Sequence, residues 1–473
     1  MMEFSGESLR RWSTERIGES RFVREKMKRR FMDPIIIGFA MFAIFFGAGN
    51  FVFPPQIGVV AGSAWKTAIL GMLITGIVLP MMTIVAVDNM GGELRYLFAP
   101  VASWGHKAFM VLFIVVMLTI GPPRQAAVAV ETGLFAIFPF MQGNTIIRIL
   151  MLAIYFLLVY YFSSNPSKIV DIIGKYLTPF LMITLIIIVV LGILKPLGPM
   201  AAPKQDNVFI YAFTQAYQTG DVCVGIGICT TFILSVKAKG YTELRSRRSI
   251  LLKAALVSLV SLLVVYGGLL YLGATGSNVF SADMDHSSLL IALINGVSGR
   301  VGNVVLGIGI YLACLTSSIG MQTILSDFTV RLSNDKFSYK KCLLVYTVVS
   351  FLLGCMGVAN IIKYTYAIFV FIYPILIVVT LMGTFRKVVP NHGAWKGTVL
   401  MAALVGLYEA AVTLNDSGVT NIHIAQLEKL YSLLPLSAEG IGWVLPCAIG
   451  FVIGMLIVML RKGRPYPMLE DAQ

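Results

Sequence analysis

Long runs of apolar residues, separated by short polar segments, follow one another along almost the whole chain. A helix rises 1.5 Å per residue, so it needs about 20 apolar residues to cross a bilayer. Runs of that size predict twelve transmembrane helices. They lie at residues 34–59, 65–87, 104–138, 145–163, 169–194, 208–235, 250–274, 301–330, 341–358, 361–385, 397–414 and 440–460.

Composition agrees with this pattern. The 473 residues are 57% hydrophobic and only 13% charged, whereas soluble domains carry about 25% charged residues. The fold class expected is an all-α polytopic membrane protein.

Run 104–138 is long enough to be strongly tilted, or to be two helices meeting at Gly121-Pro122-Pro123. Residues 280–298 hold an apolar patch too short to span, which predicts a re-entrant or surface helix.

The basic residues predict the orientation. With a cytoplasmic N-terminus, 29 of the 37 Lys and Arg residues fall on the inner side, 7 fall on the outer side, and Arg124 lies within a span. Basic residues collect in cytoplasmic loops. Both termini are therefore expected inside, and the net charge of +14 follows from topology rather than from nucleic-acid binding. Residues 1–32 are expected to be a disordered basic tail with no signal peptide, and residues 462–473 a second cytoplasmic tail.

Little in the chain suggests an enzyme. Its loops are short, it lacks a Gly-x-x-x-x-Gly-Lys-Ser/Thr phosphate loop, and its histidines form no cluster. The six cysteines are scattered singly, so we expect neither disulfides nor metal sites. Six charged residues are interpreted as structural charges in loops or at span ends: Asp88, Glu93, Arg95, Asp327, Arg331 and Glu409. Arg124 and Glu131 lie two helical turns apart, too far for a direct pair.

The first span contains an unusual stretch, Phe45-Phe46-Gly47-Ala48-Gly49-Asn50-Phe51-Val52-Phe53-Pro54-Pro55. Glycine and proline weaken a helix, and a broken helix in hydrocarbon leaves backbone groups that protein, ion or substrate must satisfy. The stretch is thus a candidate solute site. It also fits a glycine-lined packing face followed by a proline kink.

The sixth span is interrupted in a similar way. Thr219-Gly220-Asp221 lies near its middle, and an aspartate inside a span is a candidate functional residue unless it lies at an interface. Broken first and sixth spans are typical of inverted-repeat transporters, in which half-helix ends bind the ligand. Amides of Ala48, Gly49 and Asn50 would attract a carboxylate. Exposed carbonyls near Thr219 would attract an ammonium group or Na⁺.

The eighth span contributes Ala313-Cys314-Leu315-Thr316-Ser317-Ser318. Hydroxyl groups in membrane helices often bond back to their own backbone. Na⁺, however, prefers several oxygen ligands, and these hydroxyls together with carbonyls freed in the first span would provide them. The pairing with the first span favours a cation site.

These stretches resemble the branched-chain amino acid carriers of bacteria, the leucine, isoleucine and valine cation symporters. The matching segments are residues 38–58, Gly121 to Arg124 with Glu131, Thr219 to Asp221, and residues 312–320. The resemblance spans residues 33–461. It implies import of leucine, isoleucine and valine across the bacterial cytoplasmic membrane, driven by Na⁺ or H⁺. In the family pattern, several residues separate the Gly-Pro and Pro-Arg pairs of the third span, whereas Gly121 to Arg124 are contiguous here. The family also has Thr-Met-Asp in the sixth span where this chain has Thr219-Gly220-Asp221, so a changed pocket wall is expected.

The chain also resembles the wider group of LeuT-fold symporters, with two inverted five-helix repeats and two extra helices. This implies repeats at 33–198 and 199–385 and the extra helices at 386–461. It further implies a substrate site at Ala48, Gly49, Asn50, Thr219, Gly220 and Asp221, and no organic cofactor. The implied sodium ligands are the carbonyls of Ala43, Phe46 and Ala313 with the hydroxyls of Thr316 and Ser317.

Other functions stay open at this point. The carrier could take another small neutral solute or couple to H⁺ instead of Na⁺. From other classes, an amino-acid sensor would need an output domain, and a channel would pass solute without accumulating it. A membrane enzyme fits least, because no nucleophile and base are arranged for catalysis.

Overall fold

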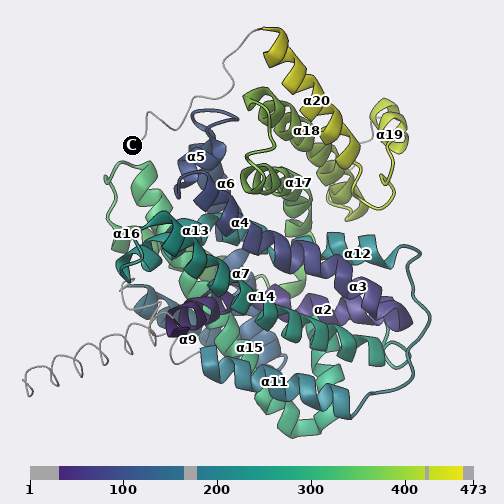
Figure 1. Cartoon of the computed structure of the whole chain (residues 1–473). Helices are drawn as coiled ribbons and strands as arrows, with labels where there is room; N and C mark the ends of the chain where they lie inside the picture. Colours follow the sequence, from purple (N-terminus) through teal and green to yellow (C-terminus); the bar gives the residue numbers. More distant parts are fainter. Residues whose placement is uncertain (1–30, 165–177, 421–424, 462–473) are drawn as a thin grey trace, which may run out of the picture.

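The computed structural model describes residues 31–164, 178–420 and 425–461. The two predicted tails lie outside these residues except for Phe31 and Met32, so the disorder expected of the first tail and the cytoplasmic location expected of both stay predictions. The described residues form helices and no strand. Figure 1 shows these helices packed side by side in one bundle.

The helices follow the predicted apolar runs. Their bounds are Phe31–Phe45, α2 (Ala48–Ala61), α3 (Trp65–Leu73), α4 (Leu79–Asn89), α5 (Leu94–Phe98), α6 (Gly105–Thr119), α7 (Gly121–Val128), α8 (Phe135–Ile137), α9 (Thr145–Ser163), α11 (Thr178–Leu194), α12 (Val208–Gln215), α13 (Asp221–Ala238), α14 (Leu244–Thr275), α15 (His286–Leu332), α16 (Tyr339–Gly354), α17 (Val358–Thr384), α18 (His392–Asp416), α19 (Ala425–Ser432) and α20 (Val444–Leu460). Short helical turns complete them: η1 (Gly62–Ala64), η2 (Ile74–Val78), η3 (Ala129–Leu134), η4 (Pro139–Met141) and η6 (Ala216–Thr219).

The length and composition of these helices confirm the fold class. Among the described residues, 8 helical stretches are long and apolar enough to cross a membrane, and three shorter apolar helices accompany them. One 42-residue stretch, Ala48–Asn89, holds parts of two predicted spans. Each of the twelve predicted runs overlaps a helix or a series of joined helices, although residues 169–177 of the fifth run lie outside the described residues. This agrees with about twelve spans.

The predicted interruptions are present. The first span breaks between Phe45 and α2, and the sixth breaks between η6 and α13. Gly220 sits at that second break with φ +78°, a left-handed conformation that glycine adopts without steric cost. The long third span bends at Ile120, between α6 and α7. The short helix expected within 280–298 is the N-terminal part of α15, set off by a kink at Gly299.

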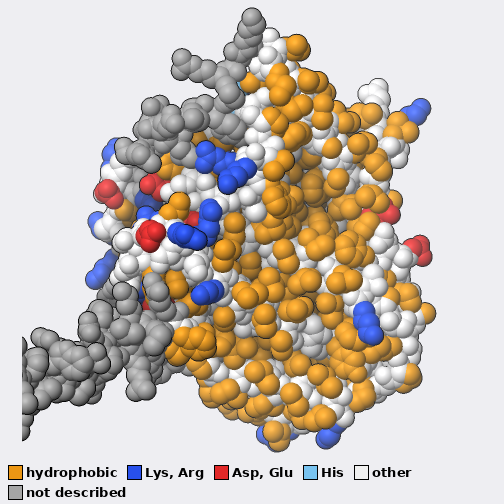
Figure 2. All heavy atoms as spheres, in the orientation of Figure 1, with side chains coloured by type: hydrophobic (Ala, Val, Ile, Leu, Met, Phe, Trp, Pro, Cys, Tyr) orange, Lys and Arg blue, Asp and Glu red, His pale blue; other side chains and the backbone are white. Residues whose placement is uncertain are grey.

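The surface agrees with a membrane location. Figure 2 shows hydrophobic side chains over most of one face, with Lys, Arg, Asp and Glu gathered mainly at its left side. Large apolar side chains of α11, α9 and α20, such as Leu194, Leu157 and Leu460, are exposed at 71%, 68% and 84%. In water such a face would be unfavourable, so these helices are suited to contact lipid.

Glycines bring several helix backbones into direct contact. A Cβ atom built on Gly58 of α2 would lie 2.1 Å from the Leu270 carbonyl oxygen of α14, and one on Gly273 would lie 2.1 Å from the Pro55 carbonyl oxygen. Small residues allow this close approach where lipid provides no hydrophobic driving force. The contact holds α2 alongside α14 and so positions the residues of the first break.

The last two long helices, α18 and α20, also pack closely through glycines. Gly393 and Gly397 of α18 face Gly450 and Gly454 of α20, and a Cβ on Gly397 would lie 1.9 Å from the Gly450 carbonyl oxygen. Glu409, expected near a span end, is instead buried within α18 and accepts a 2.6 Å hydrogen bond from the Tyr431 hydroxyl. That interpretation was wrong for Glu409, because a partner from α19 folds back onto it.

Candidate substrate and ion site

The first, sixth and seventh spans meet at one buried carboxylate. Asp221, the first residue of α13, accepts a 2.9 Å hydrogen bond from Asn50 Nδ2 and a 3.0 Å bond from the Tyr266 hydroxyl at the same oxygen, Oδ2. Asn50 also donates to the Tyr266 oxygen. Each of the three residues is at most 2% exposed. The bonds tie both broken spans to α14 at membrane depth.

The other predicted substrate residues surround this cluster. A Cβ built on Gly49 would lie 3.3 Å from the Gln218 carbonyl oxygen and 3.3 Å from Thr219 Cα. The Thr219 hydroxyl donates to the Ala216 carbonyl at 2.9 Å and accepts a long 3.4 Å bond from the Asp221 N–H. The structure therefore brings all six predicted substrate residues to the place where the two breaks meet.

The start of α2 keeps the character of an anion site. Gly47 caps the helix without a side-chain bond, and the first turn of α2 itself holds no acidic residue, although Asp221 of α13 lies beside it through Asn50. One detail differs from the prediction. The Asn50 N–H already donates to the Gly47 carbonyl at 3.1 Å, because the first turn closes tightly. The predicted amide set is thus reduced to Ala48 and Gly49.

Oxygen atoms of the first and eighth spans form a second cluster. The Thr316 hydroxyl lies 3.3 Å from the Ala43 carbonyl oxygen and 3.0 Å from that of Ala313. The Ser317 hydroxyl donates to the Ile44 carbonyl at 2.8 Å. A helix end leaves its last carbonyls without partners, and the break after Phe45 does so inside the membrane. These neutral oxygens suit a hard monovalent cation.

Phe46, the remaining predicted cation ligand, has no hydrogen bond to this cluster. The Phe46 N–H donates to the Phe42 carbonyl at 2.7 Å, and the Phe46 ring packs against Phe51 and Tyr266. Ser317 bonds to Ile44 rather than to Phe46. Ile44 was missed because one-residue differences along a helix end cannot be resolved from spacing alone.

Gln125 of α7 is a further residue that the sequence pattern did not single out. Its amide nitrogen donates to the Ser317 oxygen at 3.0 Å, and its amide oxygen accepts from Ser318 at 2.9 Å. The Tyr155 hydroxyl of α9 lies 2.7 Å from the Ser318 oxygen. A chain of hydrogen bonds thus links the fourth span to the cation cluster. The polar pair Arg124-Gln125 within a span was the available signal.

Arg124 and Glu131 have different surroundings, as their spacing indicated. Glu131 forms a 3.1 Å ion pair with Arg148 and accepts a 3.4 Å bond from the Val358 N–H at the start of α17. Arg124 is 5% exposed, and its Nε and Nη1 atoms have no hydrogen-bond partner. Its guanidinium group lies 5.7 Å from the centre of the Phe53 ring and 5.8 Å from that of Phe369.

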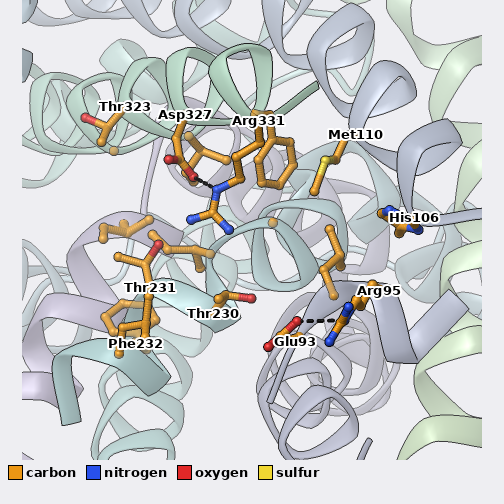
Figure 3. Close-up of a pocket in the computed structure, with 18 of the residues that line it drawn as sticks. Glu93, Arg95, His106, Met110, Thr230, Thr231, Phe232, Thr323, Asp327 and Arg331 are labelled. Carbon is orange, nitrogen blue, oxygen red and sulfur yellow. Dashed lines mark ion pairs between the residues drawn. The ribbon is translucent and has the colours of Figure 1, made fainter. Parts of the chain in front are cut away.

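A cavity of about 490 Å³ begins beside the cation cluster, at Ile44 and Gly320, and is bounded by α6, α13 and α15. Figure 3 shows polar and charged side chains around it, among them Thr230, Thr231 and His106. Two ion pairs border it, Glu93 with Arg95 at 2.9 Å and Asp327 with Arg331 at 2.8 Å. Four of the charges interpreted as structural therefore line this cavity.

The cysteines carry no such chemistry. All six are free in the structure. Within the described part of the chain, no three His, Cys, Asp or Glu side chains are grouped so that they could hold a metal ion.

Known proteins resemble the chain over nearly all of it. A family model described as branched-chain amino acid transport protein matches residues 30–461. Branched-chain amino acid permease BraB of Bacillus subtilis (strain 168) is 35% identical over 444 residues, covering 90% of this chain and 96% of the relative. The branched-chain amino acid transport system 2 carrier protein of Pseudomonas aeruginosa is 29% identical, covering 92% and 97%.

Solved structures share the fold at low sequence identity. Mhp1, a nucleobase–cation symport transporter, superposes with a TM-score of 0.57 at 13% identity and covers 93% of this chain and 95% of its own. MhsT in complex with L-phenylalanine gives a TM-score of 0.50 at 16% identity, covering 90% and 98%. These likenesses support the LeuT-like architecture that the broken spans indicated. The family match and the curated relatives show that the chain is a transporter rather than an enzyme and belongs to the branched-chain amino acid transport protein family.

Proposed function

We propose that this protein imports leucine, isoleucine and valine across the bacterial cytoplasmic membrane together with a cation, most simply Na⁺. The observation that carries the proposal is the meeting of two broken spans beside a cluster of neutral oxygens. Transporters with discontinuous helices bind substrate and ion at such breaks. The sodium-linked proposal is favoured over H⁺ because the Thr316 cluster is built from hydroxyl and carbonyl oxygens.

The substrate would lie between the first and sixth spans. The free end of α2, at Ala48 and Gly49, suits its carboxylate, whereas Thr219, Gly220 and Asp221 suit its ammonium group. Asn50 would hold Asp221 in place through its side chain. Buried apolar residues nearby, Phe46, Phe51 and Val222, suit a branched aliphatic side chain.

Coupling would arise because the cation ligands belong to different spans. Thr316 and Ser317 come from α15, while Ala43 and Ile44 come from the first span. A bound cation would replace the hydroxyl-to-carbonyl bonds that now connect these spans. Alternating access would then be a movement of a four-helix bundle against a scaffold, organised as repeats 33–198 and 199–385 with helices 386–461 added.

The cavity bordered by Glu93, Arg95, Asp327 and Arg331 would be the cytoplasmic release path. The excess of basic residues in these segments supports a position inside the cell. A cavity that reaches Ile44 from that side is what an inward-open carrier requires.

Replacement of Thr316 by alanine tests the proposed ion site. We expect Thr316→Ala to weaken Na⁺ activation of leucine uptake about tenfold or more, because one ligand and its link to Ala43 are lost. The measurement is radiolabelled leucine uptake into proteoliposomes, with Na⁺ titrated against choline at fixed pH. Thr316→Ser should retain activation. Thr347→Ala, which removes a buried hydroxyl bonded within α16, is the matched control.

Unchanged Na⁺ activation in Thr316→Ala would reject this ion site. Uptake driven equally by a pH gradient in choline would favour H⁺ coupling. If neither gradient drives accumulation by the wild-type protein, the symport proposal fails, and a channel or sensor would fit better.

Chemical labelling tests the release path. Thr231 is exposed and lines the cavity, so Thr231→Cys should react with a membrane-impermeant thiol reagent in inside-out vesicles and not in right-side-out vesicles. The wild-type protein, whose six cysteines are free, supplies the background. Labelling from the outer side alone would contradict the proposed orientation.

A further inference from the structure

The guanidinium group of Arg124 is a buried cation, and two of its nitrogen atoms have no hydrogen-bond acceptor. The side chain is 5% exposed, and no hydrogen bond or ion pair satisfies its Nε and Nη1 atoms. Burying an unpaired charge is costly, and in membrane proteins such a charge marks a functional position. The contacts with Phe53 and Phe369 hold the group in place but accept none of its hydrogen bonds.

The acidic residues nearby are already engaged. Asp221 uses Oδ2 for Asn50 and Tyr266 and forms no ion pair with Arg124. Glu131, on the same span, pairs with Arg148. Asp221 therefore attracts the charge of Arg124, but no carboxylate accepts a hydrogen bond from Nε or Nη1 of its guanidinium group.

Arg124 lies at the proposed substrate site. A Cβ built on Gly49 would lie 3.1 Å from Arg124 Nη2, so the guanidinium group adjoins the first turn of α2. The same turn carries no acidic residue and no side-chain cap at Gly47. Two positive features, a helix N-terminus and an arginine, thus converge here, and Asp221, which is bonded to Asn50, is the protein anion beside them.

We propose that Arg124 binds the carboxylate of the transported amino acid and makes a carboxylate obligatory for recognition. The inference rests on the proposed function and adds a residue from the third span to the substrate site. Arginine is suited to this role because its planar group forms paired hydrogen bonds with a carboxylate. The substrate carboxylate would neutralise the buried charge, and the free ends of Ala48 and Gly49 would complete its binding.

Competition between two leucine derivatives tests the proposal. Leucinamide keeps the side chain and amino group of leucine but lacks the carboxylate. In wild-type proteoliposomes, leucinamide should inhibit labelled leucine uptake at least about 30-fold more weakly than unlabelled leucine. In Arg124→Gln the advantage of leucine should fall to a few fold. Arg124→Lys, which keeps the charge without the planar fork, should restore part of it.

The ratio of the two inhibition constants separates recognition from folding. A structural role for Arg124 would weaken both compounds equally and leave the ratio unchanged, which would overturn the proposal. Arg300→Gln, which removes an exposed arginine of α15, is the control and should leave the ratio unchanged. Failure of wild-type protein to bind any branched-chain amino acid would instead overturn the proposed function.

Discussion

Gly49→Val is expected to reduce leucine uptake to a few per cent of the wild-type rate. Even a Cβ at this position would lie 3.1 Å from Arg124 Nη2 and 3.3 Å from both the Gln218 carbonyl oxygen and Thr219 Cα. The arginine end can move, but the backbone of the sixth span cannot move without separating the two breaks. Overpacking costs about 1–3 kcal/mol, which corresponds to roughly one to two orders of magnitude. Initial uptake rates per reconstituted protein provide the measurement.

Gly267→Val is the matched control for this substitution. A Cβ at Gly267 of α14 would lie 3.6 Å from Ile69 Cδ1, an ordinary contact with a flexible side chain. This variant should keep most of the activity. A near-normal rate in Gly49→Val would show that the first and sixth spans do not need their present close approach for transport.

Asp221→Ala is expected to abolish uptake and to lower the thermal stability of the purified protein. Removing the carboxylate leaves the Asn50 amide and the Tyr266 hydroxyl without their shared acceptor at membrane depth. An unsatisfied buried polar group costs about 1–3 kcal/mol. Thermal unfolding in detergent, together with leucine uptake, measures the two effects separately.

Asp221→Asn separates the charge from the hydrogen bonds. The amide still offers an acceptor oxygen, so this variant should unfold near the wild-type temperature but transport poorly, because the ammonium group loses its anion. Asp283→Asn, at an exposed position, should change neither quantity. Full activity of Asp221→Asn would remove Asp221 from the proposed substrate site and leave it a structural role.

Most of the fold was predictable because the bilayer sets the length of an apolar helix. The twelve runs, the kinked third span and the short helix before Gly299 all follow from this constraint together with glycine and proline. Both interruptions were also predictable, since a membrane helix with Gly47 and Gly49, or with Gly220 beside Asp221, conflicts with local helix preference.

The hydrogen bonds between residues of different helices could not be predicted in the same way. The spacing of residues along one helix does not fix its rotation against another helix. The bond from Ser317 to Ile44, rather than to Phe46, therefore could not be predicted from the sequence. Tyr266 lies in an apolar stretch of α14 with nothing in its local pattern to mark it. Gln125 stands beside Arg124 in a span, and its contact with Ser317 depends on the packing of α7 against α15.

The interlocked glycines of α18 and α20 have a consequence for how the protein is assembled. Gly393, Gly397, Gly450 and Gly454 leave no side-chain volume between the two backbones, so only the partner helix fills the groove on each. A nascent chain that stopped before Val444 would present the groove of α18 to lipid tails, which fit it poorly. Insertion of α20 against α18 is therefore needed to cover this groove.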